Sequence, residues 1–320
     1  MKNNKMRTWF LDYGIVFVLL VLVLFFSIGS ENFMKVTTIF TILKQISITG
    51  IISIGMAFVI ITGGIDLSVG SIAGVSSVTA AMLMLNKSSI PAACIITICF
   101  SLIYGTINGL LITKINMPPL IATLGMMTAL RGLGFIITDG LPVFGFSKVF
   151  GNFAKGQLWV IPYPVILLTV IFIIAVFILD RTIIGRYIYG VGGNAEASRL
   201  SGVNVTRIKL FAYSMNGFLA GVAGLVLLSR TNSGQPSAGT GYEMDAITAV
   251  VLGGVSLNGG EGKLPLVLVG VLIMGILSTG MLMLNINDYV QQLVKGLVLL
   301  GAVAFSNLSM KLRTRIESRI

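Results

Sequence analysis

The sequence predicts an all-α protein that crosses a membrane about ten times and keeps both termini in the cytoplasm. Hydrophobic residues make up 55% of the 320 residues and charged residues only 10%, with a mean hydropathy of +0.97. Soluble domains carry about 25% charged residues, so this chain is not a soluble globule. Its apolar residues form about ten runs near the length of roughly 20 residues that a spanning helix needs. Lys and Arg are concentrated in alternate connecting segments, which is typical of cytoplasmic loops.

Six apolar runs precede the longest polar segment of the chain. They cover residues 13–28, 42–62, 67–85, 92–113, 120–138 and 161–179. The first run follows Lys2, Lys5 and Arg7 and ends in small residues, so a cleaved signal peptide is an alternative. We expect the run to remain in the protein as a first span, because the chain then has an even number of spans, which is easier to place in the membrane.

Four runs follow the polar segment. They cover residues 210–229, 246–257, 264–284 and 289–305. The run 246–257 is short for a span and predicts a broken helix. We expect residues 1–320 to form a single membrane domain, with 1–11 and 309–320 as cytoplasmic ends.

The polar stretch between the two sets of runs, residues 180–208, is called the central segment below. Its arginines place it in the cytoplasm. Gly192 and Gly193 are expected to bend the chain, and Asn194 to cap a short helix by accepting a backbone N–H of its first turn. Glu196 in that turn complements the helix dipole. A short capped helix suits the docking of a partner, and an ordinary loop between two spans is the alternative.

The distribution of charge agrees with ten spans. The predicted cytoplasmic segments hold Lys2, Lys5, Arg7, Lys114, Lys263, the basic residues of the central segment with Lys209, and those of the tail. The predicted outer segments hold Lys35, Lys87, Lys148, Lys155 and Arg230, among the acids Asp139, Glu243, Asp245 and Asp288. This excess of cations on one side is the positive-inside pattern.

The string Thr-Gly-Gly-Ile-Asp-Leu-Ser-Val-Gly, residues 62–70, joins the second and third runs. Gly63 and Gly64 are expected to interrupt the helix, and Asp66 or Ser68 to cap the next helix by binding its free N–H groups. A broken helix at membrane depth is tolerated where it lines a cavity or is buried in protein. We interpret the string as part of a gate, and a simple cap in a cytoplasmic turn is the alternative.

Further polar side chains fall in or beside the spans. The candidates for lining a path are Asn108, Asn116, Thr123 and Asn216. Arg131 and Lys295 should each face a cavity or pair with an acid, unless they reach the membrane surface. A face of small residues that predicts close helix packing consists of Gly217, Gly221 and Gly224.

The residues that are absent exclude several kinds of chemistry. The chain has no His, so neither a zinc or di-iron site nor a Ser-His-Asp hydrolase is expected. The glycine-rich stretch 259–263 is not a phosphate loop, because no Ser or Thr follows Lys263. We therefore expect that this chain itself binds no cofactor, metal or nucleotide. The net charge of +11 is explained by cytoplasmic loops and not by nucleic-acid binding.

Three strings in this chain carry a family resemblance. They are residues 62–70, residues 116–125 followed by Arg131 and Gly132, and Glu196-Ala197-Ser198 followed by Gly202. Over residues 40–308 the chain resembles the ribose-type sugar permeases of bacterial ATP-binding-cassette (ABC) importers, in the branched-chain amino acid/ribose permease superfamily. Ser198 departs from the loop pattern of that family, which has Ala there.

This resemblance implies a permease subunit in the bacterial inner membrane that forms the path of a monosaccharide such as ribose or a similar pentose or hexose. Its expected partners are a pair of ATP-binding subunits, a second permease copy or homologous chain, an extracytoplasmic sugar-binding protein and membrane lipid. ATP would be used by the partner, so this chain would not be an enzyme. The expected docking residues are Gly192, Gly193, Asn194, Glu196, Ala197 and Gly202. The expected gate and path residues, from our interpretation of the spans, are Gly63, Gly64, Asp66, Asn108, Asn116, Thr123 and Asn216.

Two other functions stay open. A secondary transporter driven by an ion gradient would need a titratable or cation-binding centre near the membrane midplane, and Asp66 is the candidate acid. An amino acid permease of the same superfamily would share the whole architecture.

Overall fold

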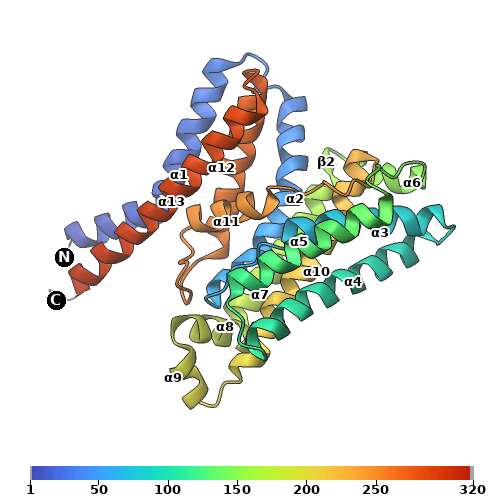
Figure 1. Cartoon of the computed structure of the whole chain (residues 1–320). Coiled ribbons are helices and arrows are strands. Elements are labelled where there is room, and N and C mark those ends of the chain that lie inside the picture. Colours follow the sequence, from blue (N-terminus) through green and yellow to red (C-terminus); the bar gives the residue numbers. More distant parts are fainter. Residues whose placement is uncertain (1, 318–320) are drawn as a thin grey trace.

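The computed structural model describes residues 2–317 and is built almost entirely of helices (Figure 1). Its longer helices are α1 (Lys2–Gly29), α2 (Val36–Ile61), α3 (Val69–Leu85), α4 (Ile90–Thr113), α5 (Pro119–Thr138), α7 (Tyr163–Arg181), α10 (Val205–Thr231), α11 (Tyr242–Leu252), α12 (Leu264–Met283) and α13 (Asp288–Glu317). Its shorter elements are α6 (Lys148–Gly151), the 3₁₀ helix η1 (Phe153–Lys155), the antiparallel strands β1 (Gln157–Leu158) and β2 (Ile161–Pro162), α8 (Ile183–Gly193) and α9 (Ala195–Leu200). The all-α prediction is confirmed.

Seven helices of the described residues are long and apolar enough to cross a membrane: α2, α4, α5, α7, α10, α12 and the Asp288–Ser306 part of α13. The helix α3 and the Gly14–Gly29 part of α1 are apolar but shorter, and α11 has only 11 residues. A multi-pass α-helical membrane protein is therefore confirmed. The number of about ten spans and the side of the termini stay predictions, and the last three residues of the predicted tail 309–320 lie outside the described residues.

The helix α10 is the centre of the larger of two groups of helices and packs against α2, α3 and α4. A Cβ on Gly217 would lie 2.7 Å from the Cα of Gly105 on α4, and one on Gly224 would overlap the carbonyl oxygen of Ala73 on α3. Gly221, between them, lies against the side chain of Ser101 on α4. The predicted face of small residues is confirmed, because only a glycine permits such a short distance between helices.

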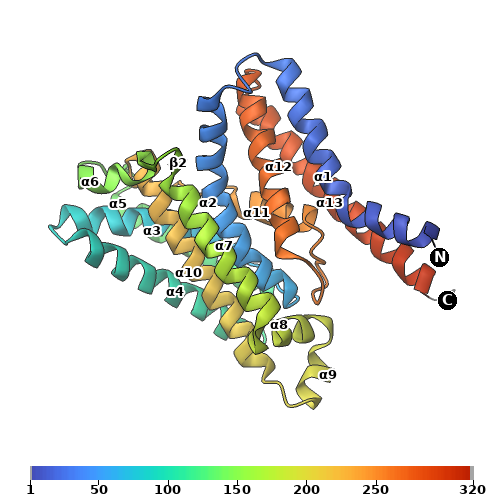
Figure 2. The ribbon, with the colours of Figure 1, turned by 180° about the vertical axis from the view of Figure 1, so that it is seen from behind.

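The smaller group contains α1, α12 and α13, and it diverges from the larger group in both views (Figure 1, Figure 2). The helix α2 lies between the groups and contacts both α10 and α12, so most of its residues are buried. The helix α11 packs against α2, α12 and α13. This arrangement places α11 where the two groups separate.

The helix α11 differs from its predicted position. The pattern predicts a helix over 246–257, but α11 begins at Tyr242 and ends at Leu252. It ends there because Gly253 and Gly254 follow, and Gly254 takes a φ of +78°. Glu243 and Asp245, which are expected in an outer loop, therefore lie in the first turn of this helix.

The central segment also differs from its prediction as a polar loop with one short helix. It contains two helices, α8 and α9, which project from the body beside the end of α2 (Figure 1). Gly192 and Gly193 complete α8 instead of bending the chain. The bend falls one residue later, at Asn194, whose backbone is extended.

Candidate functional site

The first candidate site is a buried hydrogen-bond network around Asp66, which is 0% exposed. Its Oδ1 accepts hydrogen bonds from the backbone N–H of Ser68 at 2.9 Å and from the Ser68 hydroxyl at 2.6 Å. Its Oδ2 accepts from Nδ2 of Asn216 at 3.0 Å, and Nδ2 of Asn108 donates to Oγ of Ser68 at 2.8 Å. These bonds join the turn after α2 to α4 and α10.

Side chains of α10 and α5 contact the turn that carries Asp66. Gly63 adopts a φ of +77°, which allows the chain to reverse after α2. Gly64 lies against the hydroxyl of Tyr213, so a side chain there would overlap it, and that hydroxyl donates to the carbonyl of Ile65 at 3.3 Å. Thr123 of α5 is also buried near the same carbonyl, at 3.5 Å, while it donates to its own helix at 2.9 Å.

The structure thus brings together most of the predicted path residues: Gly63, Gly64, Asp66, Asn108, Thr123 and Asn216. Asn116 is not part of this set, because it is exposed in the turn before α5, where it adopts a φ of +58°. Of the two caps predicted for α3, Asp66 or Ser68, the side chain of Ser68 does not cap the helix: Ser68 is the N-cap residue, but its hydroxyl donates to Asp66. Asp66 instead binds the N–H of the N-cap residue itself.

All donors to Asp66 are neutral groups, and each comes from a packed helix or its first turn. A buried carboxylate is costly unless it receives several hydrogen bonds, and this one receives them. The arrangement therefore acts as a polar clasp that fixes the turn to α4 and α10. The amide oxygens of Asn108 and Asn216 have no hydrogen-bond partner among the described residues. The hydrogen bonds donated by their amide nitrogens, to Ser68 and Asp66, therefore set the orientation of both side chains.

The second candidate site is the pair of helices α8 and α9. The side chain of Asn194 accepts from the N–H of Ala197 at 2.9 Å, so the predicted cap is confirmed. Glu196 lies in the first turn of α9 and pairs with Arg199 at 2.6 Å, and Gly202 follows the helix with a φ of +85°. No residue of α9 is buried, and four of its six residues are exposed.

Three glycine-rich stretches meet where α8 ends. Gly192 lies directly against the carbonyl of Ile61, the last residue of α2, and the N–H of Gly260 donates to that carbonyl at 2.8 Å. A Cβ on Gly259 would lie 2.8 Å from the backbone nitrogen of Gly63. The exposed helix α9 is therefore connected, through α8 and the stretch 258–262, to the turn that leads to Asp66.

Tyr189 adds a side-chain bond to this junction. Its hydroxyl donates to the carbonyl of Gly262 at 3.0 Å. Burial, and secondly the negative charge of Asp180, raise the pKa of Tyr189. The phenol is therefore a neutral donor at physiological pH, which suits a structural bond.

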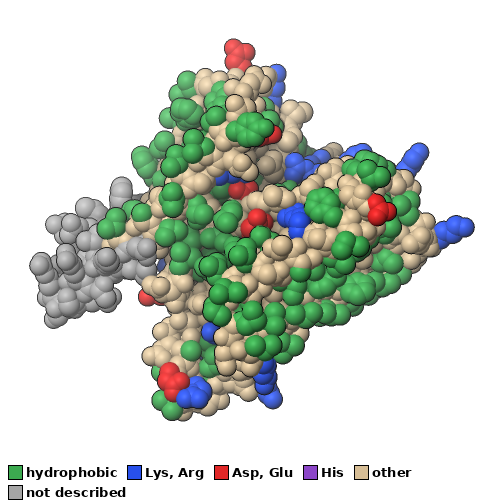
Figure 3. Space-filling view, viewed as in Figure 1, with side chains coloured by type: hydrophobic (Ala, Val, Ile, Leu, Met, Phe, Trp, Pro, Cys, Tyr) green, Lys and Arg blue, Asp and Glu red, His purple; other side chains and the backbone are tan. Residues whose placement is uncertain are grey.

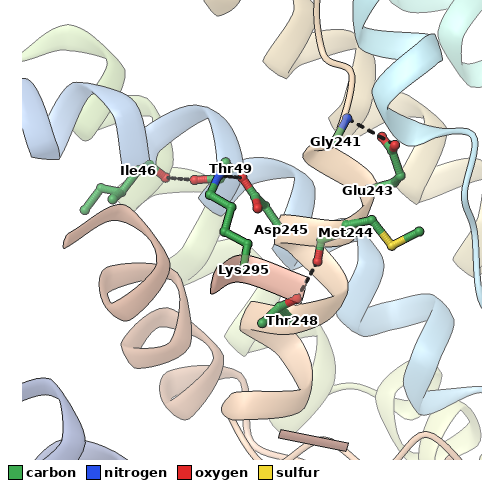
Figure 4. Close-up of polar contacts among 8 residues, drawn as sticks. All are labelled: Ile46, Thr49, Gly241, Glu243, Met244, Asp245, Thr248 and Lys295. Carbon is green, nitrogen blue, oxygen red and sulfur yellow. Dashed lines mark hydrogen bonds and ion pairs between the residues drawn. The ribbon is translucent and has the colours of Figure 1, made fainter. Parts of the chain in front are cut away.

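Charged side chains form a third cluster around the first turn of α11 (Figure 4). Lys295 of α13 binds Oδ2 of Asp245 at 2.8 Å, which confirms the prediction that it pairs with an acid. Arg131 of α5 donates to the carbonyls of Pro236 and Ala238 at 3.1 and 3.0 Å, in the segment that precedes α11. Among the described residues there is no group of three or more His, Cys, Asp or Glu side chains that could hold a metal ion.

Sequence reasoning missed three parts of these sites. Tyr213 reads as one more residue of an apolar span, and nothing local shows that its hydroxyl meets the turn after α2. Gly259 and Gly260 form part of a rejected phosphate loop, although two adjacent glycines already indicate a tight backbone contact. Asp245 could have been found, because an acid in the first turn before an apolar run is a signal for a helix start.

The chain matches, over residues 38–303, the family model described as branched-chain amino acid transport system / permease component. It is 41% identical to the ribose import permease protein RbsC of Escherichia coli K12 over 305 residues, which cover 94% of this chain and 95% of the relative. It is 45% identical to the ribose import permease protein RbsC of Bacillus subtilis 168 over 287 residues, 89% of each chain.

A third relative is the L-arabinose transport system permease protein AraH of Escherichia coli K12. It is 36% identical over 305 residues, which cover 95% of this chain and 93% of the relative. No solved structure matches the chain. The helical membrane fold and these nearly full-length matches show that the chain belongs to the family of branched-chain amino acid transport system permease components.

Proposed function

We propose that this chain forms the membrane path of an ATP-driven importer for a monosaccharide, ribose or a similar pentose or hexose. The observation that carries the proposal is the similarity to ribose and L-arabinose permeases over about nine-tenths of the chain. Because the relatives are permease subunits, the chain is a transport subunit and not an enzyme. ATP hydrolysis belongs to a separate subunit, and a binding protein on the outer side delivers the sugar.

The proposal includes a topology in the bacterial inner membrane. The seven long apolar helices cross the membrane together with α1, α3 and α11, and both termini lie in the cytoplasm. The support for this orientation is the excess of Lys and Arg in alternate connections. The short helix α11 does not reach across a bilayer by itself, so the segment before it, 232–241, completes its passage.

The docking element for the ATP-binding subunit is α9 with the end of α8. An interaction surface must be exposed and yet held in a defined position. The helix α9 satisfies both conditions, because it buries none of its own residues while the glycine junction holds α8 against α2. We assign Gly192, Gly193, Asn194, Glu196, Ala197 and Gly202 to this docking element.

The gate lies behind the docking element. The turn with Gly63, Gly64 and Asp66 is joined to the junction at one end and to Asn108 and Asn216 at the other. A displacement of α8 would therefore be transmitted to the turn and to the helices that the clasp holds. A second permease copy or a homologous chain would complete the path from the other side.

Affinity purification of the tagged chain from its own membranes, followed by an ATPase assay, tests the importer. We expect a stoichiometric ATP-binding chain that is lost in Glu196→Lys, because Glu196 is exposed on α9. Glu31→Lys is the matched control, since Glu31 is an exposed acid between α1 and α2. A chain that purifies alone, and whose uptake stops with an ionophore, would replace the proposal by an ion-driven transporter.

Uptake into vesicles that contain the whole complex tests the substrate. Ribose and L-arabinose are compared with leucine, because the family model is described by branched-chain amino acid transport. ATP-dependent uptake of a pentose without uptake of leucine is the expected result. Uptake of leucine alone would make the chain an amino acid permease.

A further inference from the structure

The connection between α10 and α11 is an irregular backbone segment packed among apolar helices. After α10 ends, residues 232–241 contain no helix and lie against α3 and α5. Gly74 faces the carbonyl of Ala238, and Gly70 faces the carbonyl of Gly239, so the segment lies directly on the backbone of α3. Non-helical backbone at membrane depth occurs where it is buried in protein or lines a polar cavity.

Charged side chains of both signs surround the turn in which α11 begins. Lys295 and Asp245 form an ion pair at 2.8 Å, with side-chain exposures of 27% and 13%. Arg131 and Glu243 also interact electrostatically, on the other side of the turn. In Figure 4, Asp245 points toward Lys295 while Glu243 points away from it, toward Gly241. Arg230 also acts electrostatically on Tyr242, the first residue of α11, so the turn offers both positive and negative groups.

This cluster lies at a hollow of the surface. Figure 3 shows acidic and basic side chains gathered where the two groups of helices diverge, near α11 and α5. Met244, between the two acids in the sequence, is 47% exposed, so the turn is open to a molecule in this hollow. A charged residue among apolar spans is costly and indicates a functional site.

Several buried oxygens on α11 and on the helices that it contacts lack hydrogen-bond partners among the described residues. Oε2 of Glu243 has none among the described residues, although the residue is only 7% exposed. The hydroxyls of Ser53 on α2 and Ser71 on α3, the two helices that α11 contacts on that side, are in the same state. Buried polar atoms are normally satisfied, so these oxygens are positions where a water molecule or a ligand hydroxyl would supply the missing bond.

We propose that the first turn of α11, with Glu243, Asp245, Lys295 and Arg131, is a contact site for an uncharged polyhydroxylated ligand. This inference rests on the proposed function, since it assigns sugar contacts within the proposed path. A hydroxyl both donates and accepts, so it binds to carboxylates and to ammonium or guanidinium groups without breaking their ion pairs. A zwitterionic amino acid would have to compete with the ion pair of Lys295 and Asp245, which is already formed.

Protection of a cysteine in this turn from maleimide labelling, by a bound ligand, tests the site without a transport assay. Met244→Cys is made in a Cys94→Ser, Cys99→Ser background, and the complete complex is labelled with a maleimide in the presence of ribose, L-arabinose or leucine. We expect about tenfold slower labelling at a pentose concentration about ten times the Kd. Met34→Cys is the control, because Met34 is 57% exposed between α1 and α2 and its labelling should not change.

Substitutions distinguish a ligand contact from a structural ion pair. Asp245→Asn should weaken pentose protection about tenfold or more, since a hydrogen bond to a charged group is lost. The double variant Asp245→Asn, Lys295→Gln removes both charges together. If the ion pair is purely structural, pentose protection should return in the double variant. If Asp245 contacts the ligand, protection should stay weak. Asp288→Asn, at an exposed acid of the same helix as Lys295, should leave protection unchanged.

The outcomes separate this site from the importer assignment. Pentose uptake by wild-type vesicles without any protection at Met244→Cys would overturn the site and leave the importer intact. Protection by leucine and not by a pentose would overturn the polyol assignment. Pentose protection that fails in Asp245→Asn supports the site even if no ATP-binding subunit accompanies the chain.

Discussion

Gly192, the second-last residue of α8, lies against the carbonyl oxygen of Ile61, the last residue of α2, with no room for a side chain between them. The same carbonyl accepts the N–H of Gly260, so three segments far apart in the sequence meet at one oxygen atom. The contact joins α8 and α9, the proposed docking element, to the helix whose end carries the Asp66 turn. A protein that transmits motion from a cytoplasmic subunit to its membrane path needs such a rigid connection.

Gly192→Ala should lower the stability of the protein and reduce uptake. The new Cβ would overlap the Ile61 carbonyl and the Gly260 backbone, and overpacking of this kind costs about 1–3 kcal/mol. Gly193→Ala is the matched control, because nothing lies within 4 Å of its Cβ position. Thermal unfolding in detergent measures the difference between the two variants, and uptake by Gly192→Ala is compared with that of the wild type. Equal melting temperatures of the two variants would mean that the junction is loose.

Asp66→Asn should destabilise the clasp by about 2 kcal/mol, because the new amide group turns a donor toward the donors of Ser68 or Asn216. Asp139→Asn is the comparison, since Asp139 is an exposed residue at the end of α5 with a φ of +50°, which Asn tolerates. Its change in unfolding free energy should stay within about 0.5 kcal/mol. If Asp66→Asn unfolds like the wild type, the network does not hold the turn.

Asn194→Ala should open α9 without changing the stability of the whole chain. The side-chain bond to Ala197 is the cap of a helix that buries none of its residues, and such a cap is worth about 1 kcal/mol. Hydrogen exchange at the Ala197 amide should become about fivefold faster. Association with the ATP-binding subunit should fall in parallel, and Asn194→Asp, which keeps an acceptor, should restore both. Unchanged exchange in Asn194→Ala would contradict the role of the cap.

Gly217→Val should prevent α10 from packing on α4. A Cβ at this position would already lie 2.7 Å from the Cα of Gly105, and the two methyl groups of Val would overlap that backbone further. The loss in unfolding free energy should therefore exceed about 3 kcal/mol. Gly125→Val on α5 is the control, because its Cβ position is open. The yield of folded protein in size-exclusion chromatography is the measurement. Similar yields for both variants would show that α10 can move away from α4 at low cost.

The sequence by itself determined those features that depend on neighbours along the chain or on solvent. The apolar runs predict the spanning helices, because a membrane requires about 20 apolar residues whatever the fold. Asn194 caps α9 as predicted, since a cap is formed within four residues. The glycine face of α10 and the need of Lys295 for an acid are likewise consequences of the residue type in an apolar surrounding.

Only the tertiary structure decided which distant residues meet. Asn108 and Asn216 lie 42 and 150 residues from Asp66 in the sequence, and both belong to its hydrogen-bond network. Asn116 has the same side chain and lies close to Asn108 in the sequence, but it is exposed and outside the network. Gly192 and Gly260 both contact the carbonyl oxygen of Ile61, at the end of α2. Glu243 is buried in the first turn of α11, whereas the sequence predicts it in an outer loop. The physical reason is that local patterns specify the conformation of a segment, whereas the partner of a buried polar atom depends on how the helices cross, and no spacing in the sequence encodes that.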